Sequence, residues 1–554
     1  MDTAFARAAG DHLTREAGPG GPPLGAPAWV VQATVGFVAL GILLRVARYL
    51  LNFPLWCDET MIAANFLERG YLDLFRPLDY RQVAPLLWLV VELTSVKVLG
   101  FSEWSLRLFP FLCGVASVPL FRHVAGRVVT GVPLLLAVAV FAVSGWPLRY
   151  VAEVKPYASD LFVALGLLAL ALEWWRARER VEWLQALAVA GPVAVALSLP
   201  SLFVLGGLGV GLAWPVWRTG RRDARQALGL FAAGVVLAFL AMAPFYHTAP
   251  QDHDYFHSAW AGAFPPLDNL GRLVVWFLDV NTGYLFAYPE GGEHGASALT
   301  FLAFAAGAVV LWRRGRRIPV ALCLLPFGLA LAAAAIHRYP YGISARTSQY
   351  AVPMICLLAG TGMALALAQL RSDLWRRRAL ATSAALLALL GLARLGHDLV
   401  YPYKTITDER VRSFAQWFWI EQSREGELVC LKTDLGVVVN PKLWTGAATD
   451  TYLCYQRIYS PRHNRRAAPD LARVSPTRPL RCVVFNEYPD DNPAFVGWIA
   501  DMYKRYDLRD IVPYKVSSLE PKRGPTWDQL YRVYEFVPKA EPAVAGETPA
   551  TSRR

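Results

Sequence analysis

Residues 29–51 read WVVQATVGFVALGILLRVARYLL, and the acidic pair Asp58 and Glu59 follows a short loop later. A helix needs about 20 apolar residues to cross the hydrocarbon core of a bilayer, so this stretch is predicted to span a membrane. It is too long for the apolar part of a signal peptide and no small-residue cleavage site follows it, so we expect it to stay as an anchor. The acidic pair should therefore lie directly at a membrane surface.

The rest of the chain contains further long apolar runs. Of its 554 residues, 55% are hydrophobic and only 18% are charged, and the mean hydropathy is +0.32. These values exclude disordered, collagen-like and small disulfide-scaffold proteins and indicate long contact with lipid. Seven Cys residues suggest no disulfide framework. Ten further spans are predicted, over residues 104–123, 128–147, 157–175, 184–198, 201–217, 226–246, 297–312, 318–336, 348–370 and 379–395.

Arginine placement predicts the orientation. The net charge is +12, and with a cytoplasmic N-terminus the short inner loops carry seventeen Arg, whereas the outer loops between the second and last spans carry only five basic residues. Positive charge is enriched on the cytoplasmic side of membrane proteins. Eleven spans then place the segment after about residue 396 outside the cell membrane.

Four parts are therefore predicted: a cytoplasmic tail (1–28), a transmembrane domain (29–396), an extracytoplasmic α/β domain (397–539) and a disordered tail (540–554). In the α/β domain, strand-like runs at 428–431, 437–439 and 480–485 alternate with helical patterns at 411–423 and 494–506. The apolar stretch 83–100 carries Glu92 and Lys97 and would invert every later loop if it crossed. We interpret it as an amphipathic interfacial helix, with a twelfth span as the alternative.

Ionisable residues gather in three segments on the predicted outer face. Charge at membrane depth is costly, so such residues are functional candidates. The segments contain Asp58 and Glu59 after the first span, then Arg149, Glu153, Lys155 and Tyr157 after the third, and then Arg338, Tyr341 and Arg346 after the ninth. A carboxylate can take the proton from an attacking hydroxyl, while cations stabilise charge on a departing phosphate. A sugar joined to a lipid phosphate fits this set of groups.

Four motifs in these regions resemble integral-membrane glycosyltransferases of the GT-C fold, similar to protein O-mannosyltransferases and the lipid A aminoarabinose transferase. The order and spacing of the motifs match over roughly residues 30–370. The motifs read Trp56-Cys57-Asp58-Glu59, Gly100-Phe101-Ser102-Glu103-Trp104-Ser105-Leu106-Arg107-Leu108, Glu153-Val154-Lys155-Pro156-Tyr157-Ala158 and Arg338-Tyr339-Pro340-Tyr341-Gly342. The resemblance implies that Asp58 is the catalytic base, that Glu59 supports it, and that Lys155, with Arg149, Arg338 and Arg346, contacts the carrier phosphate. Two departures are Lys155, where many relatives have Arg, and Gln82-Val83-Ala84-Pro85 in place of a His-Pro-Pro type.

Simpler explanations stay open for each group. Asp58 and Glu59 could cap the helix that follows them. Glu153 and Lys155 could be a solvated interfacial pair, and Arg338 and Arg346 could extend to lipid headgroups. The loop 247–294 holds four His near three carboxylates, but without tight ligand spacing, so no metal site is predicted. Cys430, Cys454 and Cys482 allow several disulfide pairings.

The leading hypothesis is an inverting membrane glycosyltransferase that moves a hexose or pentose from a polyprenyl phosphate to an extracytoplasmic glycan, lipid or protein. Its partners would be the lipid-linked donor, the acceptor and the bilayer, with no cofactor and no nucleic acid. The outer loop 248–296, which includes Trp260, Phe264 and Trp276, is expected to cover the cavity. The alternative from another class is a transporter or flippase for a lipid-linked saccharide, in which the same charges line a path.

Overall fold

The computed structural model describes residues 27–245, 258–422, 424, 428–432, 455, 458–459, 479–485, 493–514 and 531–539. It divides into two compact units. The bundle unit comprises Met1–Phe53 and Asn65–Pro402, and the second unit comprises Pro54–Ala64 and Tyr403–Arg554. The short segment Pro54–Ala64, which carries Asp58 and Glu59, thus belongs with the C-terminal residues.

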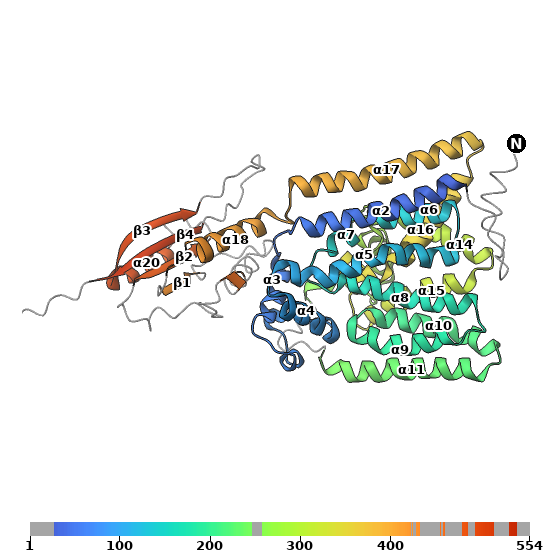
Figure 1. Cartoon of the computed structure of the whole chain (residues 1–554), viewed down its shortest axis with the longest axis horizontal. Coiled ribbons are helices and arrows are strands. Elements are labelled where there is room, and N and C mark those ends of the chain that lie inside the picture. The colour runs from blue at the N-terminus through green and yellow to red at the C-terminus, as the bar shows by residue number, and fades with distance from the viewer. Residues whose placement is uncertain are drawn as a thin grey trace, which may run out of the picture. The chain divides into compact units, whose positions relative to one another are not determined.

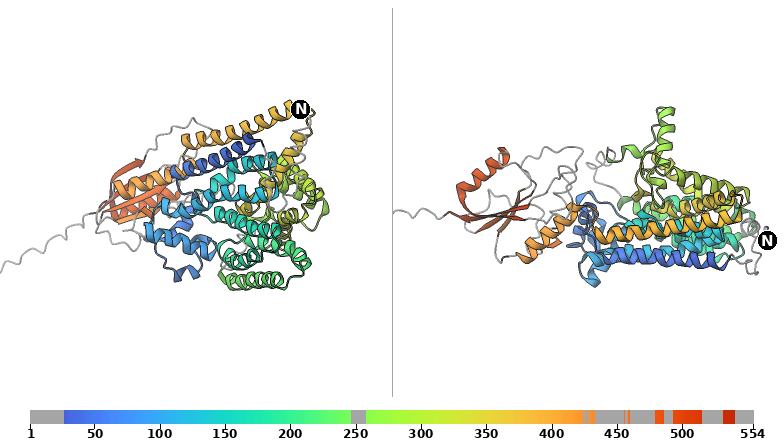
Figure 2. Two further views of the ribbon diagram at one scale, coloured as in Figure 1. Left: turned by 45° about the vertical axis from the view of Figure 1, so that its right-hand side comes forward. Right: turned by 90° about the horizontal axis from the view of Figure 1, so that it is seen from above.

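The bundle unit has a helix at each of the eleven positions predicted to span the membrane, and Figures 1 and 2 show them side by side. Their bounds are α2 Ala28–Leu50, α5 Glu103–Val128, α6 Val132–Val143, α8 Tyr157–Arg176, α9 Glu182–Leu197, α10 Ser201–Arg218, α11 Arg222–Met242, α14 Ala298–Arg313, α15 Arg317–Ala335, α16 Val352–Ala368 and α17 Asp373–Val400. Within the described residues, eight helices are long and apolar enough to cross a bilayer, and α6, α9 and α14 are apolar but shorter. The fold is that of a helical polytopic membrane protein, while the number of crossings remains a prediction.

Helix α16 is the most enclosed of the eight long candidates, and small residues explain how its neighbours approach it. It packs against α14 and α6. A side chain at Gly362 would meet the carbonyl oxygen of Ala303 at 1.8 Å, and one at Gly360 would meet the backbone nitrogen of Ala137 at 2.4 Å. Such close backbone packing is the usual source of helix association in lipid.

The periphery of the bundle is apolar and open. Only 6% of the apolar window of α11 is buried, and Leu230, Leu237 and Leu240 are each more than 60% exposed. An apolar surface of this extent needs a covering, and lipid provides it.

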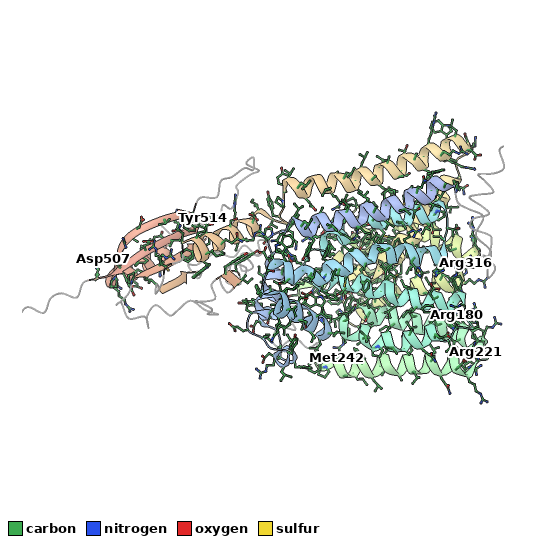
Figure 3. All side chains as sticks on the ribbon, viewed as in Figure 1. Arg180, Arg221, Met242, Arg316, Asp507 and Tyr514 are labelled. Atoms are coloured by element: carbon green, nitrogen blue, oxygen red, sulfur yellow. The ribbon has the colours of Figure 1, made fainter. Side chains whose placement is uncertain are left out.

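Arginine and tryptophan side chains gather at one end of the bundle. Figure 3 places Arg180, Arg221 and Arg316 at one end, with Met242 of α11 toward the other. At the arginine end, guanidinium groups lie over tryptophan rings, with Cζ 4.4–5.9 Å from the ring centroids in the pairs Arg218–Trp214, Arg225–Trp217, Arg316–Trp175, Arg317–Trp312 and Arg378–Trp375. Arginine and tryptophan at helix ends are typical of a membrane interface. Which side of the membrane this end faces stays a prediction.

The stretch 83–100 forms α4 (Leu86–Leu99), which is absent from the helices long enough to span. Its predicted amphipathic character is wrong, because apolar residues cover both its buried and its exposed sides. Leu89 and Leu93 are buried, whereas Val98 and Leu99 are exposed. Glu92 is fully buried, and neither of its oxygens has a hydrogen-bond partner among the described residues.

The predicted span 128–147 ends early, at Val143, and a short helix α7 (Gly145–Tyr150) follows it. Ser144 has extended backbone angles, which separates the two helices. Gly145 packs directly against Arg394, whose Nη2 would lie 2.1 Å from any added side chain. This break lets α7 carry Arg149 at the end of the bundle opposite the arginine cluster.

The second unit contains a small mixed sheet with strand order β1-β2-β4-β3 (β1 Leu428–Lys432, β2 Leu480–Phe485, β3 Tyr506–Tyr514, β4 Tyr531–Pro538). Strands β1 and β2 are parallel, and β4 pairs antiparallel with β2 and β3. This unit also contains α3 (Cys57–Ala63), α18 (Ile406–Gln416), the π-helical turn η9 (Trp417–Glu421) and α20 (Pro493–Arg505). The predicted α/β class is confirmed, while the predicted strand 437–439 lies outside the described residues.

Candidate functional site

The residues that flank the segment Pro54–Ala64 on both sides form hydrogen bonds within the bundle unit. Arg107, which is 1% exposed, donates from Nη1 to the carbonyl oxygen of Phe53 at 2.5 Å. At the other end, the Asn65 side-chain oxygen accepts from the backbone nitrogen of Asp79 at 2.8 Å. The contact with Phe53 gives Arg107, from the second motif of the sequence resemblance, a structural role within the bundle unit.

Asp58 and Glu59 occupy the first turn of α3 (Cys57–Ala63), where their surroundings differ. Glu59 is fully buried, and its Oε2 accepts from the backbone nitrogen of Trp56 at 3.2 Å, which caps the helix. The same oxygen lies 2.5 Å from Nζ of Lys404 in a buried ion pair. Asp58 is partly exposed. Adjacent positions on a helix do not face each other, so the two carboxylates point in different directions.

The segment between α7 and α8 buries a second acidic residue. Arg149 Nε donates to Glu153 Oε1 at 2.9 Å, with side-chain exposures of 35% and 1%. The Arg149 guanidinium also lies over the ring of Trp146, 5.6 Å from its centroid. Glu153 is therefore a buried partner of Arg149, which argues against the solvated interfacial pair considered for this segment.

Lys155 is 7% exposed, and its Nζ donates to Oε1 of Gln82 at 2.6 Å. Gln82 in turn donates from Nε2 to the carbonyl oxygen of Tyr80 at 3.1 Å. Tyr80 has φ of 59°, a left-handed conformation that is strained for a bulky residue and often occurs at functional sites. Gln82 was noticed in the sequence only as a departure from the expected pattern, and its contact with Lys155 was not predicted.

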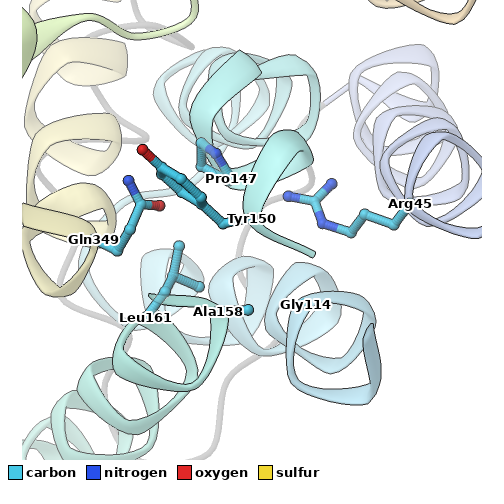
Figure 4. Close-up of a pocket in the computed structure, with 7 residues that line it drawn as sticks. All are labelled: Arg45, Gly114, Pro147, Tyr150, Ala158, Leu161 and Gln349. Carbon is cyan, nitrogen blue, oxygen red and sulfur yellow. The ribbon is translucent and has the colours of Figure 1, made fainter. Parts of the chain in front are cut away.

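Tyr157 packs edge-on against Tyr150, with ring centroids 4.8 Å apart. Burial and the neighbouring Glu153 raise the pKa of Tyr150 well above its ordinary value. Figure 4 shows Tyr150 between Gln349 and Arg45 at a small cavity. Arg45 donates to the carbonyl oxygens of Gly41 and Ala142, so its guanidinium group is already hydrogen-bonded to the backbone. The cavity is about the size of one water molecule, so it is no substrate site.

The segment after α15 supplies the third group. Arg338 is exposed, and the Arg346 guanidinium lies 4.9 Å from the centroid of Trp260. Tyr341 is buried: its hydroxyl approaches Oδ1 of Asn281 at 3.3 Å and its backbone nitrogen donates to Ala263 at 3.2 Å. Tyr341 therefore fastens this segment to the outer loop.

The outer loop contributes described aromatic residues to the same region. The ring of Phe264 lies 4.7 Å from that of His337, and the ring of Trp276 lies 6.0 Å from that of Tyr341. The loop thus packs on the segment 337–346, and its role as a cover stays a prediction. Two further aromatic residues of this loop, Tyr255 and Phe256, lie outside the described residues.

Within each unit, the structure brings some of the predicted site residues together. Asp58 and Glu59 belong to the second unit, whereas Arg149, Glu153, Lys155, Tyr157, Arg338, Tyr341 and Arg346 belong to the bundle unit. Sequence reasoning missed Lys404 and Gln82 as partners. Lys404 lies four residues after the end of α17, in a stretch that carried no motif.

Two further predictions concern His and Cys residues. Among the described residues, no group of three His, Cys, Asp or Glu could hold a metal ion. His247, His253 and His257 lie outside that part of the chain. Cys482 is disulfide-bonded, and the side chains of Cys430 and Cys454 are not among those described, so the pairing stays open.

Sequence comparison matches the chain to no protein-family profile and to no characterised protein. Solved structures do resemble it. The structure of ArnT from Cupriavidus metallidurans bound to undecaprenyl phosphate is similar at TM-score 0.50 and 16% identity, covering 92% of this chain and 98% of that one. The chain has the GT-C fold.

A second similar structure is the archaeal oligosaccharyltransferase AglB from Archaeoglobus fulgidus, in complex with an inhibitory peptide and a dolichol-phosphate. Its TM-score is 0.47 at 12% identity, and the match covers 80% of this chain and 64% of that one. The fold resemblance noted on the four sequence motifs is thus confirmed by ArnT.

Chemically, the second unit offers a partly exposed carboxylate beside a buried one, and the bundle unit offers a nearly buried ammonium beside an amide. A carboxylate of this kind can act as a general base. A fixed ammonium can stabilise a developing phosphate charge. Low exposure strengthens such an interaction because less water competes with it.

Proposed function

We propose that this protein is a membrane glycosyltransferase that uses a polyprenyl-phosphate sugar as donor. The acceptor is a hydroxyl, or similar nucleophile, of an extracytoplasmic glycan, lipid or protein. The protein is a multi-pass component of the cell (inner) membrane, with its active site and C-terminal domain outside. No cofactor enters the reaction.

In this mechanism, the Asp58 carboxylate takes the proton from the acceptor hydroxyl. The hydroxyl oxygen attacks the anomeric carbon and forms the new glycosidic bond. The bond between that carbon and the phosphate oxygen breaks, and both of its electrons stay with the polyprenyl phosphate. Attack from the face opposite the leaving group inverts the anomeric configuration.

The observation that carries the proposal is the difference between Asp58 and Glu59. Glu59 is fully buried, caps α3 and pairs with Lys404, so it has a structural task. Asp58 keeps part of its surface exposed on the same turn. A general base must reach its substrate, and Asp58 meets that condition, whereas Glu59 supports it.

The cations of the bundle unit support the same assignment. Lys155 is the least exposed of the candidate phosphate ligands and is oriented by Gln82. In our proposal it stabilises the leaving phosphate, Arg149 adds to the positive field, and Arg338 and Arg346 approach the carrier from the segment after α15. The fold likeness to ArnT, whose structure was solved with undecaprenyl phosphate, is consistent with such a donor.

The experiment measures transfer from radiolabelled undecaprenyl-phosphate hexoses and pentoses in isolated membranes, using Asp58→Asn. We expect transfer to fall by about 10³-fold, in line with the loss of a general base, while carrier binding persists. Asp268→Asn is the matched control, because Asp268 is an exposed carboxylate of the outer loop.

Undiminished transfer in Asp58→Asn would remove Asp58 from the role of base. The same vesicles test the flippase alternative. If the labelled carrier crosses the bilayer and no glycosidic product forms with any donor, transport replaces transfer as the function.

A further inference from the structure

Lys404 is the least expected residue beside the acidic pair. It follows the last long helix and directly precedes α18, whose first turn is capped by Thr405. Its Nζ lies 2.5 Å from Glu59 Oε2, although the two residues are 345 positions apart in the sequence. Their side chains are only 5% and 0% exposed, so the ion pair is shielded from water.

The Lys404–Glu59 ion pair involves the same helical turn that carries Asp58. Besides Glu59, the Lys404 ammonium approaches Trp56, with Nζ 5.5 Å from the ring centroid. Trp56 donates its backbone nitrogen to the same Glu59 oxygen that binds Lys404. Asp58 sits in the sequence between these two residues, so its backbone is fixed on both sides.

A second contact from the C-terminal residues reaches the same segment. Tyr455, which is fully buried, donates its hydroxyl to the carbonyl oxygen of Leu55 at 2.9 Å. Its ring stacks on Tyr459, whose hydroxyl lies 3.2 Å from Gln416 Nε2 at the end of α18. Residues before and after Asp58 are therefore both held by the part of the chain that begins at Tyr403.

Lys404 itself is placed by local structure. Thr405 Oγ1 accepts from the backbone nitrogen of Asp408 at 3.2 Å and donates to Oδ2 of that residue at 2.6 Å. Asp408 is buried. This cap fixes the start of α18 immediately after Lys404 and limits where the ammonium can lie.

A buried ion pair is a poor device for stability alone, because desolvation of both charges offsets their attraction. It does, however, set one geometry strongly, since either charge without the other is costly. We propose that Lys404 is a positioning residue for sugar transfer: by holding Glu59 it fixes the first turn of α3, and with it the direction of the Asp58 carboxylate. The turnover of the enzyme then depends on the segment that leads into the C-terminal domain.

This inference rests on the proposed function, and its test uses the full-length protein in membranes. Lys404→Met keeps the length of the side chain and removes its charge. We expect kcat to fall about 10- to 100-fold, with KM for the labelled carrier within about twofold of the wild-type value, because a misdirected base affects the chemical step. Lys404→Arg should recover most of kcat. Lys504→Met is the matched control, since Lys504 forms an exposed pair with Asp501 in the same unit and its loss should leave kcat unchanged.

A double variant separates positioning from folding. Glu59→Leu combined with Lys404→Met removes both buried charges, so the melting temperature should return toward the wild-type value. If the pair positions Asp58, kcat stays low in this variant. If kcat recovers together with the melting temperature, the pair only stabilises the fold and the inference is wrong.

Two other outcomes would overturn the positioning role of Lys404. A Lys404→Met enzyme that turns over like the wild type overturns the inference and leaves the proposed function intact. A wild-type protein that transfers no sugar from any carrier overturns the proposed function, and the positioning role with it.

Discussion

The two ends of the helical bundle use cations in different ways. At one end, the guanidinium groups of Arg218, Arg225, Arg316, Arg317 and Arg378 lie over tryptophan rings. At the other end, cations contact polar side chains: Arg48 pairs with Asp398, Arg394 with Glu290, Arg149 with Glu153, and Lys155 donates to Gln82.

The difference teaches that the contact partner of a cation, and not its residue type, separates an interface anchor from a candidate site. An exposed cation over an aromatic ring keeps most of its water and costs little to move. A cation held by a buried acid or amide has a fixed position, so its charge can act on a substrate at a defined place. Substitutions of the same kind at the two ends should therefore have unequal effects.

The largest effect is expected at Lys155. Lys155→Met removes a nearly buried ammonium and should lower kcat/KM for transfer about 10²- to 10³-fold, the usual cost of losing one preorganised charge donor. The measurement is product formation from labelled carrier in membranes. Arg316→Met, at the opposite end, should stay within about twofold of the wild type. Equal losses in both variants would abolish the distinction between the ends.

A smaller effect is expected on stability at Arg149. Arg149→Gln removes the guanidinium that donates to the buried Glu153, and we expect a loss of about 2 kcal/mol in the free energy of unfolding. This value lies below that for a fully buried pair because Arg149 is 35% exposed. Thermal unfolding in detergent measures it. Arg221→Gln breaks the exposed pair with Asp223 and serves as the control, so an equal drop in its melting temperature would contradict the prediction.

The smallest effect, again on stability, is expected at Glu92. This residue is a buried carboxyl of α4 with no hydrogen-bond partner among the described residues. Burial raises its pKa well above the ordinary value. The folded state therefore favours the protonated form, and stability is lost as pH rises above the pKa of the unfolded chain. Glu92→Gln should raise the unfolding free energy at pH 8 by about 1 kcal/mol.

The gain should shrink as the pH is lowered toward the pKa of the unfolded chain, because the free-energy cost of protonating the wild-type carboxyl on folding then decreases. Melting curves of the two proteins at pH 5 and pH 8 give the comparison. A gain that is independent of pH would show that the amide improves packing instead of removing a charge.

The sequence predicted the helices of the bundle well because lipid imposes local rules. A run of about 20 apolar residues can satisfy its backbone only as a helix, whatever its neighbours are. Every predicted span between residues 29 and 395 contains a helix. The errors occur where a tertiary contact intervenes, as at Ser144, where α6 ends and Gly145 packs against Arg394.

The candidate site was predictable only in part. The motifs located Asp58, Glu59, Glu153 and Lys155, because these residue types near membrane depth are costly and therefore noticeable. The partners of these residues were not predictable. Gln82 was noticed only as a departure from the expected pattern and Lys404 lay in no motif, and nothing within their local sequence indicates which side chain they bind.

By itself, then, the amino-acid sequence determined that this chain is a bundle of membrane helices with its arginines gathered in one set of loops, since apolar length and loop charge are local quantities. Tertiary structure alone decided that Glu59 meets Lys404 and that Lys155 meets Gln82. Such a choice depends on which distant segments pack together and exclude water, and this is settled only when the whole chain has folded.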